Sequence, residues 1–109
     1  MNVIEELTKE IRQFTEERDW DQFHNPKDLA IALNIESAEL LECFLWKESR
    51  KASVDKIKEE LADVLTYSLL LADKLCLDVP SIIRDKQKQN AEKYPVEKAR
   101  GTSKKYTDL

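Results

Sequence analysis

The scarcity of glycine and proline constrains the fold of this chain more than any other feature. One glycine and three prolines occur among its 109 residues. Because these residues punctuate turns and long loops, a chain with so few of them has little room for β-hairpins. Helix-favouring leucine, glutamate, lysine and alanine dominate the sequence instead. The sequence therefore predicts an all-α protein.

Apolar residues recur at helical spacing in segments that are separated by capping signals. A first stripe predicts a helix that ends near Arg18. Asn25 before Pro26 is an N-cap followed by proline in the first turn, and Ser53 is a further N-cap. Pro95 stops a last helix at Tyr94. We expect four helices, over about residues 3–18, 26–46 and 54–75 and from the break at 78–81 to residue 94.

The length and charge of the chain limit its organisation and its partners. At 109 residues it fits one domain, residues 1–109, with a polar tail over about residues 96–109. Its net charge of −4 comes from interleaved acidic and basic residues, which does not favour nucleic-acid binding. The beginning of the chain does not resemble a signal peptide, and the most apolar run, Val64–Ala72, is too short to cross a bilayer. We expect a cytoplasmic protein without a membrane partner.

Two matching acidic pairs, Glu36 with Glu39 and Glu60 with Asp63, lie in the middle of the second and third predicted helices. Each pair has i,i+3 spacing, so both carboxylates leave the same face of their helix. Apolar residues flank both pairs, and carboxylates on half-buried faces are costly unless a cation neutralises them. Two such helices packed together would aim four carboxylates at one point, which suits a hard cation.

The other metal-ligating residue types narrow the choice of cation. The only histidine, His24, falls in a predicted loop, whereas zinc and di-iron sites recruit imidazole. Cys43 and Cys76 lack metal-type spacing, and we expect them to be reduced and buried. Mg²⁺ remains, with Mn²⁺ as a substitute, and Mg²⁺ is usually shared with substrate phosphates. The alternative is a solvated acidic face with ion pairs such as that from Lys56 to Glu60.

Polar and aromatic residues elsewhere could complete a nucleotide site. Lys86, Asn90 and Lys93 stand at i, i+4 and i+7, along one face of the fourth predicted helix, as a polyphosphate clamp requires. A solvated basic face is the alternative. Aromatic side chains that could sandwich a nucleobase are Trp20, Phe23, Trp46 and Tyr67. Each of these aromatics could instead be a core residue or an interface anchor.

The second and third predicted helices carry apolar residues around much of their circumference. A four-helix unit of this length cannot cover both faces of such helices. We therefore expect a self-association surface that joins the long helices of two or more subunits, with a closed monomeric bundle as the alternative.

These motifs resemble the MazG-like superfamily of all-α nucleoside triphosphate pyrophosphohydrolases, whose hallmark is ExxE followed by ExxD. Here the hallmark reads Glu36-Ser-Ala-Glu39 and Glu60-Leu-Ala-Asp63. The similarity is closest to the dCTP pyrophosphatase branch and covers nearly the entire chain. It is carried by the runs Glu17-Arg18-Asp19-Trp20-Asp21-Gln22-Phe23-His24, Phe44-Leu45-Trp46-Lys47, Glu59-Glu60-Leu61-Ala62-Asp63-Val64, Tyr94-Pro95 and Lys104-Lys105-Tyr106-Thr107-Asp108-Leu109.

The resemblance implies a fold, an activity and a role for each motif. It implies a four-helix MazG-like bundle that assembles through its long helices into a dimer or a tetramer, a dimer of dimers. It also implies hydrolysis of dCTP or a modified dCTP to a monophosphate and pyrophosphate, in the service of nucleotide pool sanitation. The implied site residues are Glu36, Glu39, Glu60 and Asp63 for Mg²⁺ and catalysis, Lys86, Asn90 and Lys93 for the triphosphate, and Trp20, His24, Trp46 and Tyr67 for base and sugar.

Two points of function stay open at this stage. Glu36 or Glu39 is expected to be the general base, since the family places its first pair next to the attacking water. The alternatives to a dCTP pyrophosphatase are an enzyme of other or broader nucleotide specificity, and a non-catalytic helical module that binds a partner protein.

Overall fold

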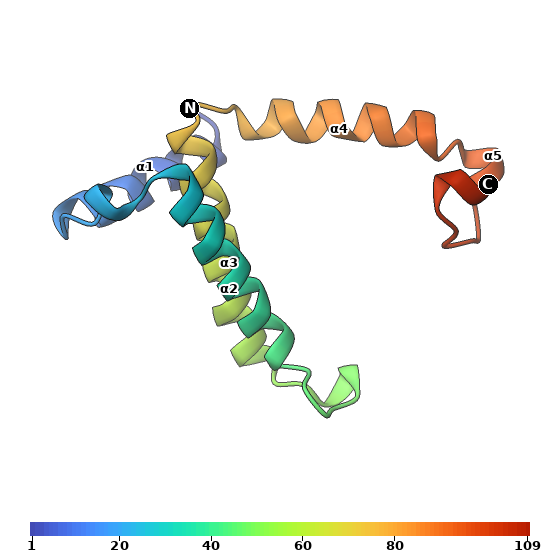
Figure 1. Cartoon of the computed structure of the whole chain (residues 1–109), viewed down its shortest axis with the longest axis horizontal. Helices are drawn as coiled ribbons and strands as arrows, with labels where there is room; N and C mark the ends of the chain where they lie inside the picture. Colours follow the sequence, from blue (N-terminus) through green and yellow to red (C-terminus); the bar gives the residue numbers. More distant parts are fainter. The chain divides into compact units, whose positions relative to one another are not determined.

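The computed structural model describes residues 1–109 and contains helices and loops but no strand. The five α-helices are α1 (Val3–Glu17), α2 (Pro26–Glu42), α3 (Val54–Lys74), α4 (Val79–Lys93) and α5 (Val96–Ala99) (Figure 1). Three short 3₁₀ helices are η1 (Asp21–Phe23), η2 (Ser49–Lys51) and η3 (Tyr106–Asp108). The predicted all-α class is confirmed. The chain divides into two compact units, Met1–Leu77 and Asp78–Leu109.

The helices begin where the sequence supplies capping side chains. Asn25 accepts a hydrogen bond of 2.9 Å from the backbone N–H of Asp28, and Pro26 occupies the first turn of α2. Ser53 caps α3 by accepting from the backbone N–H of Lys56. Such caps satisfy N–H groups that have no partner inside the helix, and each contributes about 1 kcal/mol. The two predicted starts are therefore confirmed.

The end of α2 differs from the prediction. The helix stops at Glu42 instead of continuing to about Trp46, and the next residues form turns. Trp46 has a φ of 59°, in the left-handed region that ends helices, and it is 94% exposed. The backbone N–H groups of Cys43, Phe44 and Leu45 bond carbonyl oxygens three residues back instead of four, so tighter turns replace the α-helix before Trp46 is reached.

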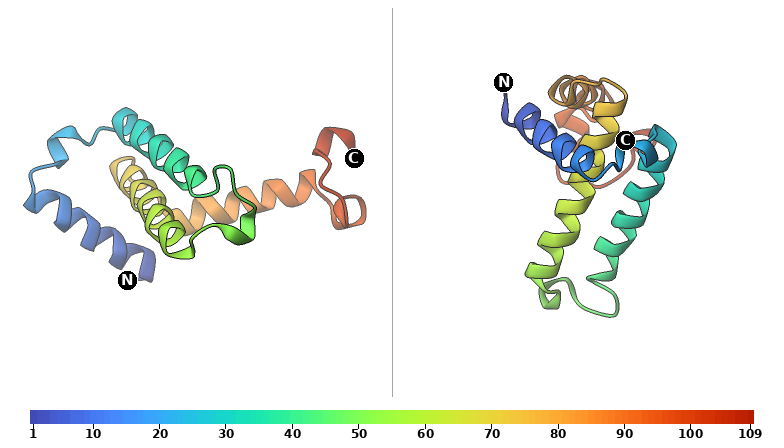
Figure 2. Two further views of the ribbon diagram at one scale, coloured as in Figure 1. Left: turned by 90° about the horizontal axis from the view of Figure 1, so that it is seen from below. Right: turned by 90° about the vertical axis from the view of Figure 1, so that its left-hand side faces the viewer.

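Helices α2 and α3 form an antiparallel hairpin, side by side along their length (Figures 1 and 2). Their contact is apolar: Leu29 on α2 is 1% exposed, and Leu70 and Ala72 on α3 are 6% and 7% exposed. Cys43 is buried at the end of α2, as expected, but Cys76 is exposed, because it lies in the turn after α3. The hairpin therefore sets the relative positions of the two acidic pairs.

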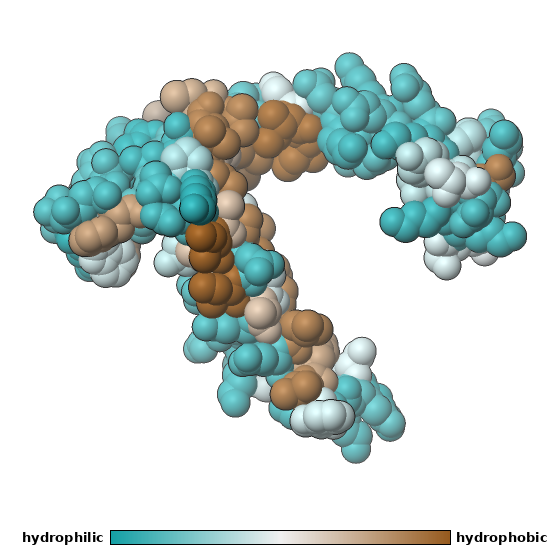
Figure 3. Space-filling model, in the orientation of Figure 1, coloured by the Kyte–Doolittle hydropathy of each residue, from teal (hydrophilic) through white to brown (hydrophobic).

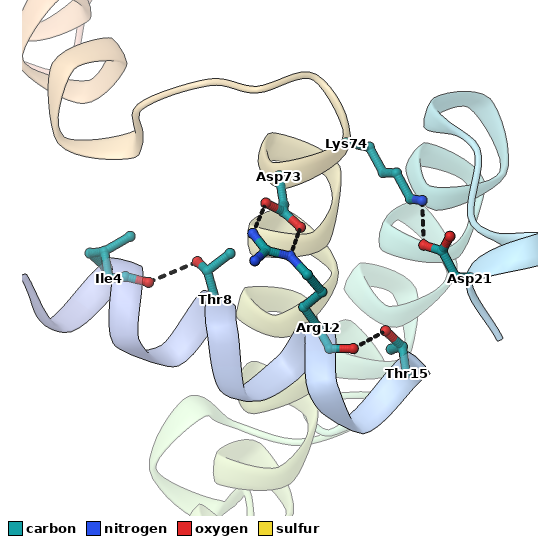
Figure 4. A network of polar contacts seen from close by, with 7 residues as sticks. All are labelled: Ile4, Thr8, Arg12, Thr15, Asp21, Asp73 and Lys74. Atoms are coloured by element: carbon teal, nitrogen blue, oxygen red, sulfur yellow. Dashed lines mark hydrogen bonds and ion pairs between the residues drawn. The ribbon is translucent and has the colours of Figure 1, made fainter. Parts of the chain in front are cut away.

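Helix α1 packs against α3 and is joined to it by a polar network (Figure 4). The Nε of Arg12 donates to Oδ2 of Asp73 over 2.9 Å, and the second guanidinium nitrogen bonds the other oxygen of Asp73. Lys74 pairs with Asp21 in η1. These contacts hold α1 and the loop that follows it against the C-terminal half of α3.

The second unit consists of α4, α5 and η3. Its tail was predicted as a polar segment, and it contains these two short helices. Tyr106 packs edge-on to Tyr94 with ring centroids 6.0 Å apart, and the ammonium of Lys93 lies 4.9 Å from the Tyr106 ring. The tail therefore folds back onto the end of α4. No helix of the chain is both long enough and apolar enough to traverse a lipid bilayer.

Candidate metal and nucleotide site

Three carboxylates meet on the α2–α3 hairpin. Glu36 comes from α2 and Glu60 and Asp63 come from α3, and one oxygen of each lies within 4.8 Å of the others. The i,i+3 spacing on α3 and the antiparallel packing of α2 bring them to one place. This arrangement is an acidic cluster that can hold a divalent cation. We call Glu36, Glu60 and Asp63 the acidic cluster.

Glu39, the fourth predicted ligand, stands beside the acidic cluster. Its carboxylate is not among the three that meet within 4.8 Å. It is nevertheless close enough to Glu36 and Glu60 to raise the pKa of both. A cation at the acidic cluster would therefore lie within the field of four acidic side chains.

The acidic cluster is electrostatically strained. Partial burial raises the pKa of Glu36 to about 7, and the neighbouring Glu39, Asp63 and Glu60 carboxylates add to the rise. Partial burial also raises the pKa of Glu60, followed by the effect of Glu39 and Asp63. Carboxylates that cannot all ionise near one another need either protons or a cation. The geometry therefore favours binding of positive charge.

Two oxygens of the acidic cluster have no hydrogen-bond partner. Oε2 of Glu36 and Oε2 of Glu60 are buried and unpaired. Such atoms are costly to bury, and a metal ion satisfies them as well as a donor would. The ion pairs of the chain lie elsewhere, so Lys56 does not neutralise Glu60. The cluster is therefore unlike a solvated face that is stabilised by local ion pairs.

A cavity of about 410 Å³ adjoins the acidic cluster on the side of α1 and η1. Its wall includes three of the four residues predicted to surround a base and sugar, Trp20, His24 and Tyr67, and one acid of the cluster, Asp63. The remaining lining residues are Glu10, Ile11, Phe14, Thr15, Thr66 and Leu70. We call this space the aromatic cavity. Trp46 does not line it, because it lies in the loop at the other end of α2.

The aromatic side chains of this cavity are fixed by contacts with one another. The ring of Phe14 meets Trp20 edge-on at 5.8 Å, and the guanidinium of Arg18 lies 3.6 Å from the centre of the Phe14 ring. His24 meets Tyr67 edge-on at 6.5 Å. Nδ1 of His24 is buried and unpaired, so it is free to bond a ligand.

Tyr67 links the aromatic cavity to the acidic cluster. Partial burial raises the pKa of its hydroxyl, and the negative charges of Glu36, Asp63 and Glu39 raise it further. The hydroxyl therefore stays protonated and can donate a hydrogen bond at the boundary between the two features.

A second cavity, of about 330 Å³, adjoins the cluster toward the α2–α3 loop. Its lining residues are Glu39, Glu42, Cys43, Lys47, Lys56, Glu59 and Glu60. Glu60 lines this cavity and Asp63 lines the aromatic cavity, so the acidic cluster lies between the two. Sequence reasoning did not assign Lys47 and Lys56 to a site, since only packing brings them to one cavity.

The three residues predicted to bind phosphate belong to the second unit. Lys86, Asn90 and Lys93 are exposed on α4, where their spacing places them along one face. Their side chains make no hydrogen bond or ion pair within the chain, although Lys93 contacts the Tyr106 ring. Their role toward a ligand stays a prediction.

The chain matches one protein family, and its curated relatives share a single name. The profile of the MazG-like family matches residues 31–109, which include both acidic pairs. The chain is 38% identical to dCTP pyrophosphatase 1 of Mus musculus over 98% of its own length and 68% of the relative's length. It is 37% identical to dCTP pyrophosphatase 1 of Homo sapiens, with the same coverage.

A solved structure supports the fold. The crystal structure of a pyrophosphatase from Archaeoglobus fulgidus superimposes on this chain with a TM-score of 0.79 at 36% sequence identity. The match covers 87% of this chain and 94% of the archaeal chain. The similarity therefore extends over most of both folds.

Proposed function

This chain belongs to the MazG-like family, and on that premise we propose that it is a Mg²⁺-dependent nucleoside triphosphate pyrophosphohydrolase. Its substrate is dCTP or a modified dCTP, and its products are the nucleoside monophosphate and pyrophosphate. The pyrophosphatase class rests on the curated relatives and on the archaeal structural neighbour. The choice of dCTP rests on the names of the curated relatives.

The observation that carries the proposal is the position of the acidic cluster beside the aromatic cavity. Asp63 belongs to both, and Glu36 and Glu60 of the cluster each have a buried oxygen without a hydrogen-bond partner. A ligand with its base among Trp20, His24 and Tyr67 would carry its phosphates toward these carboxylates.

The donor set fits a hard divalent cation. The acidic cluster offers carboxylate oxygens alone, which suit Mg²⁺ or Mn²⁺ better than zinc. When bound, such a cation neutralises phosphate charge and lowers the pKa of a water molecule. Glu36, Glu60 and Asp63, with Glu39 beside them, would hold it. Glu36 or Glu39 would accept the proton of the water that attacks the α-phosphorus.

The phosphates also require positive side chains. We assign this role to Lys86, Asn90 and Lys93 on α4, because two ammonium groups and an amide share one helix face. Hydrolysis at the α-phosphorus depends mainly on positioning and on charge stabilisation. These side chains would orient the leaving pyrophosphate.

We further propose that the hairpin self-associates into a dimer or a tetramer. Apolar residues on its outer surface, Ile31, Ile35, Leu41, Leu61 and Leu65, are between 43% and 71% exposed. Figure 3 shows brown, hydrophobic areas over α2 and α3. Burial of such side chains contributes about 25 cal/mol for each Å² of apolar surface. A second copy would cover this surface, and it could bring its own Trp46 to the base and sugar.

The biological setting follows from the same proposal. An enzyme that removes dCTP or its modified forms would act where nucleotides are made and used, so we place it in the cytoplasm. Its role there would be sanitation of the nucleotide pool.

Release of pyrophosphate from dCTP tests the proposed function. The purified chain is incubated with dCTP in the presence and absence of Mg²⁺, and pyrophosphate is measured. We expect Mg²⁺-dependent release with dCMP as the second product. A helical module that only binds a partner protein would release none. The same assay with the common and 5-modified triphosphates then separates a dCTP enzyme from one of broader specificity.

A further inference from the structure

Some of the polar side chains that line the aromatic cavity already make hydrogen bonds within the chain, and others do not. Oγ1 of Thr15 donates to the carbonyl of Arg12 over 2.9 Å, and Oγ1 of Thr66 donates to the carbonyl of Ala62 over 2.8 Å. Both hydroxyl protons are thus used within their own helices. Asp63 belongs to the acidic cluster. These three side chains leave little capacity to read a base.

Glu10 is the one carboxylate lining the cavity that does not belong to the acidic cluster. It is exposed on α1, its carboxylate makes no hydrogen bond or ion pair within the chain, and it is not part of the acidic cluster. Phe14 stands four residues later on the same helix face and also lines the cavity. Glu10 therefore presents an unengaged carboxylate at the edge of an aromatic space.

The position of Glu10 relative to the rest of the cavity is held by neighbouring contacts. Arg12, two residues along α1, is hydrogen-bonded to Asp73 on α3. Lys74, the next residue of α3, pairs with Asp21 in the loop that carries Trp20 and His24. The carboxylate and the rings thus belong to elements that are tied to the same end of α3.

An ionised carboxylate accepts hydrogen bonds and cannot donate them. A base in the aromatic cavity therefore gains from Glu10 only if it presents an N–H group there. Cytosine presents its exocyclic amine, whereas uracil and thymine present a carbonyl oxygen at the same ring position. An oxygen facing the carboxylate would leave two acceptors opposed and desolvated, which is unfavourable. The Glu10 carboxylate can therefore discriminate cytosine from uracil and thymine, although these bases are similar in size.

We propose that Glu10 is a specificity residue that accepts a hydrogen bond from the exocyclic amine of the substrate base and so selects cytosine over uracil and thymine. This inference rests on the proposed function for the presence of a nucleotide in the cavity. It adds a charged residue on α1 to a site whose proposed base-binding and metal-binding side chains come from the η1 loop, α2 and α3.

Substitution of Glu10 tests this role. Wild type, Glu10→Leu and Glu10→Gln are compared by kcat/KM for dCTP and dUTP. Glu10→Leu should lower the ratio of dCTP to dUTP by about tenfold or more, the usual effect of losing one good base contact. Glu10→Gln should raise activity on dUTP, because an amide can donate to the uracil oxygen. Glu6→Gln is the control, since Glu6 lies one turn earlier on α1, lines neither cavity and should leave the ratio unchanged.

A binding measurement separates failure of this inference from failure of the proposed function. The affinities of wild type and Glu10→Leu for dCMP and dUMP are measured by calorimetry. If wild type cleaves no triphosphate, the proposed function is wrong, and loss of a dCMP preference in Glu10→Leu would still support the role of Glu10. The same ratio of dCTP to dUTP turnover in wild type and both variants, together with the same ratio of dCMP to dUMP affinity in wild type and Glu10→Leu, would overturn the role of Glu10.

Discussion

The carboxylates of Glu36 and Asp63 approach within 4.8 Å of each other, although the two residues belong to different helices. Their approach depends on the packing of α2 against α3, in which Leu29 and Leu70 are buried. Part of the favourable free energy of packing α2 against α3 therefore offsets the repulsion between these like charges. A cation that relieves this repulsion would bind to the folded hairpin and stabilise it.

Loss of a ligand from α3 should abolish turnover without unfolding the chain. We expect Glu60→Gln and Asp63→Asn to lower the rate of pyrophosphate release by about 100-fold or more, as removal of an electrostatic group from a catalytic site does. Each substitution also removes a repelled charge, so circular dichroism should show an intact helical protein. Full activity in either purified variant would contradict the assignment.

The stability of the metal-free protein should fall as the pH rises from about 5 to 8. The folded-state pKa of Glu36, about 7, exceeds its ordinary value, so the folded protein binds more protons than the unfolded chain between those two values. The stabilisation is complete below the ordinary pKa and is lost as the pH passes through 7. Thermal melts of wild type and Glu36→Gln in EDTA measure it. The melting temperature of the variant should change less with pH, and equal slopes would argue against a raised pKa.

Mg²⁺ binding should release protons at pH values below about 7. Because its pKa is raised to about 7, Glu36 is mostly protonated at these pH values in the metal-free protein, and it must lose that proton to become a ligand. Calorimetric titrations in two buffers of different ionisation enthalpy give the number of protons. The release should be largest near pH 6 and should disappear above pH 8. A heat of binding that does not depend on the buffer at pH 6 would be inconsistent with this coupling.

The link between Arg12 and Asp73 should contribute modestly to stability and more to substrate binding. Both side chains are partly exposed, so Arg12→Met should lower the free energy of unfolding by about 0.5–1 kcal/mol. Because α1 carries Glu10 and Phe14, its release should also raise KM. Urea titrations and steady-state kinetics measure the two effects. Arg50→Met is a matched control, since the pair of Arg50 with Glu48 lies in the α2–α3 loop, and it should leave KM unchanged.

Self-association should fail when charge is placed on the outer face of the hairpin. Leu41 and Leu65 are 71% and 56% exposed, so Leu41→Lys with Leu65→Lys should leave the fold intact and yield a monomer. Sedimentation velocity of wild type and of the double variant measures the mass. Val96→Lys, at a 70% exposed position in the second unit, is the control. A monomeric wild type would refute the proposed assembly.

The sequence predicted those parts of the site that depend on spacing within one helix. The i,i+3 pairs on α2 and α3 indicated a common acidic point, and caps such as Asn25 indicated where helices begin. The end of α2 was missed because apolar residues continue at helical spacing through residues 43–46, where the backbone changes to tighter turns. Glu10 was missed because its place in the wall of the aromatic cavity depends on how α1 packs on α3. Such long-range contacts leave no periodic signal in a single sequence.

Hydrolysis of dCTP in ¹⁸O-labelled water tests the central claim most directly. Water that attacks the α-phosphorus beside the acidic cluster would place the label in dCMP and leave pyrophosphate unlabelled. Mass spectrometry of the two products from the Mg²⁺-loaded protein reads the outcome. We predict labelled dCMP, with no product from Glu60→Gln. Label in pyrophosphate, or release of orthophosphate in its place, would contradict the account.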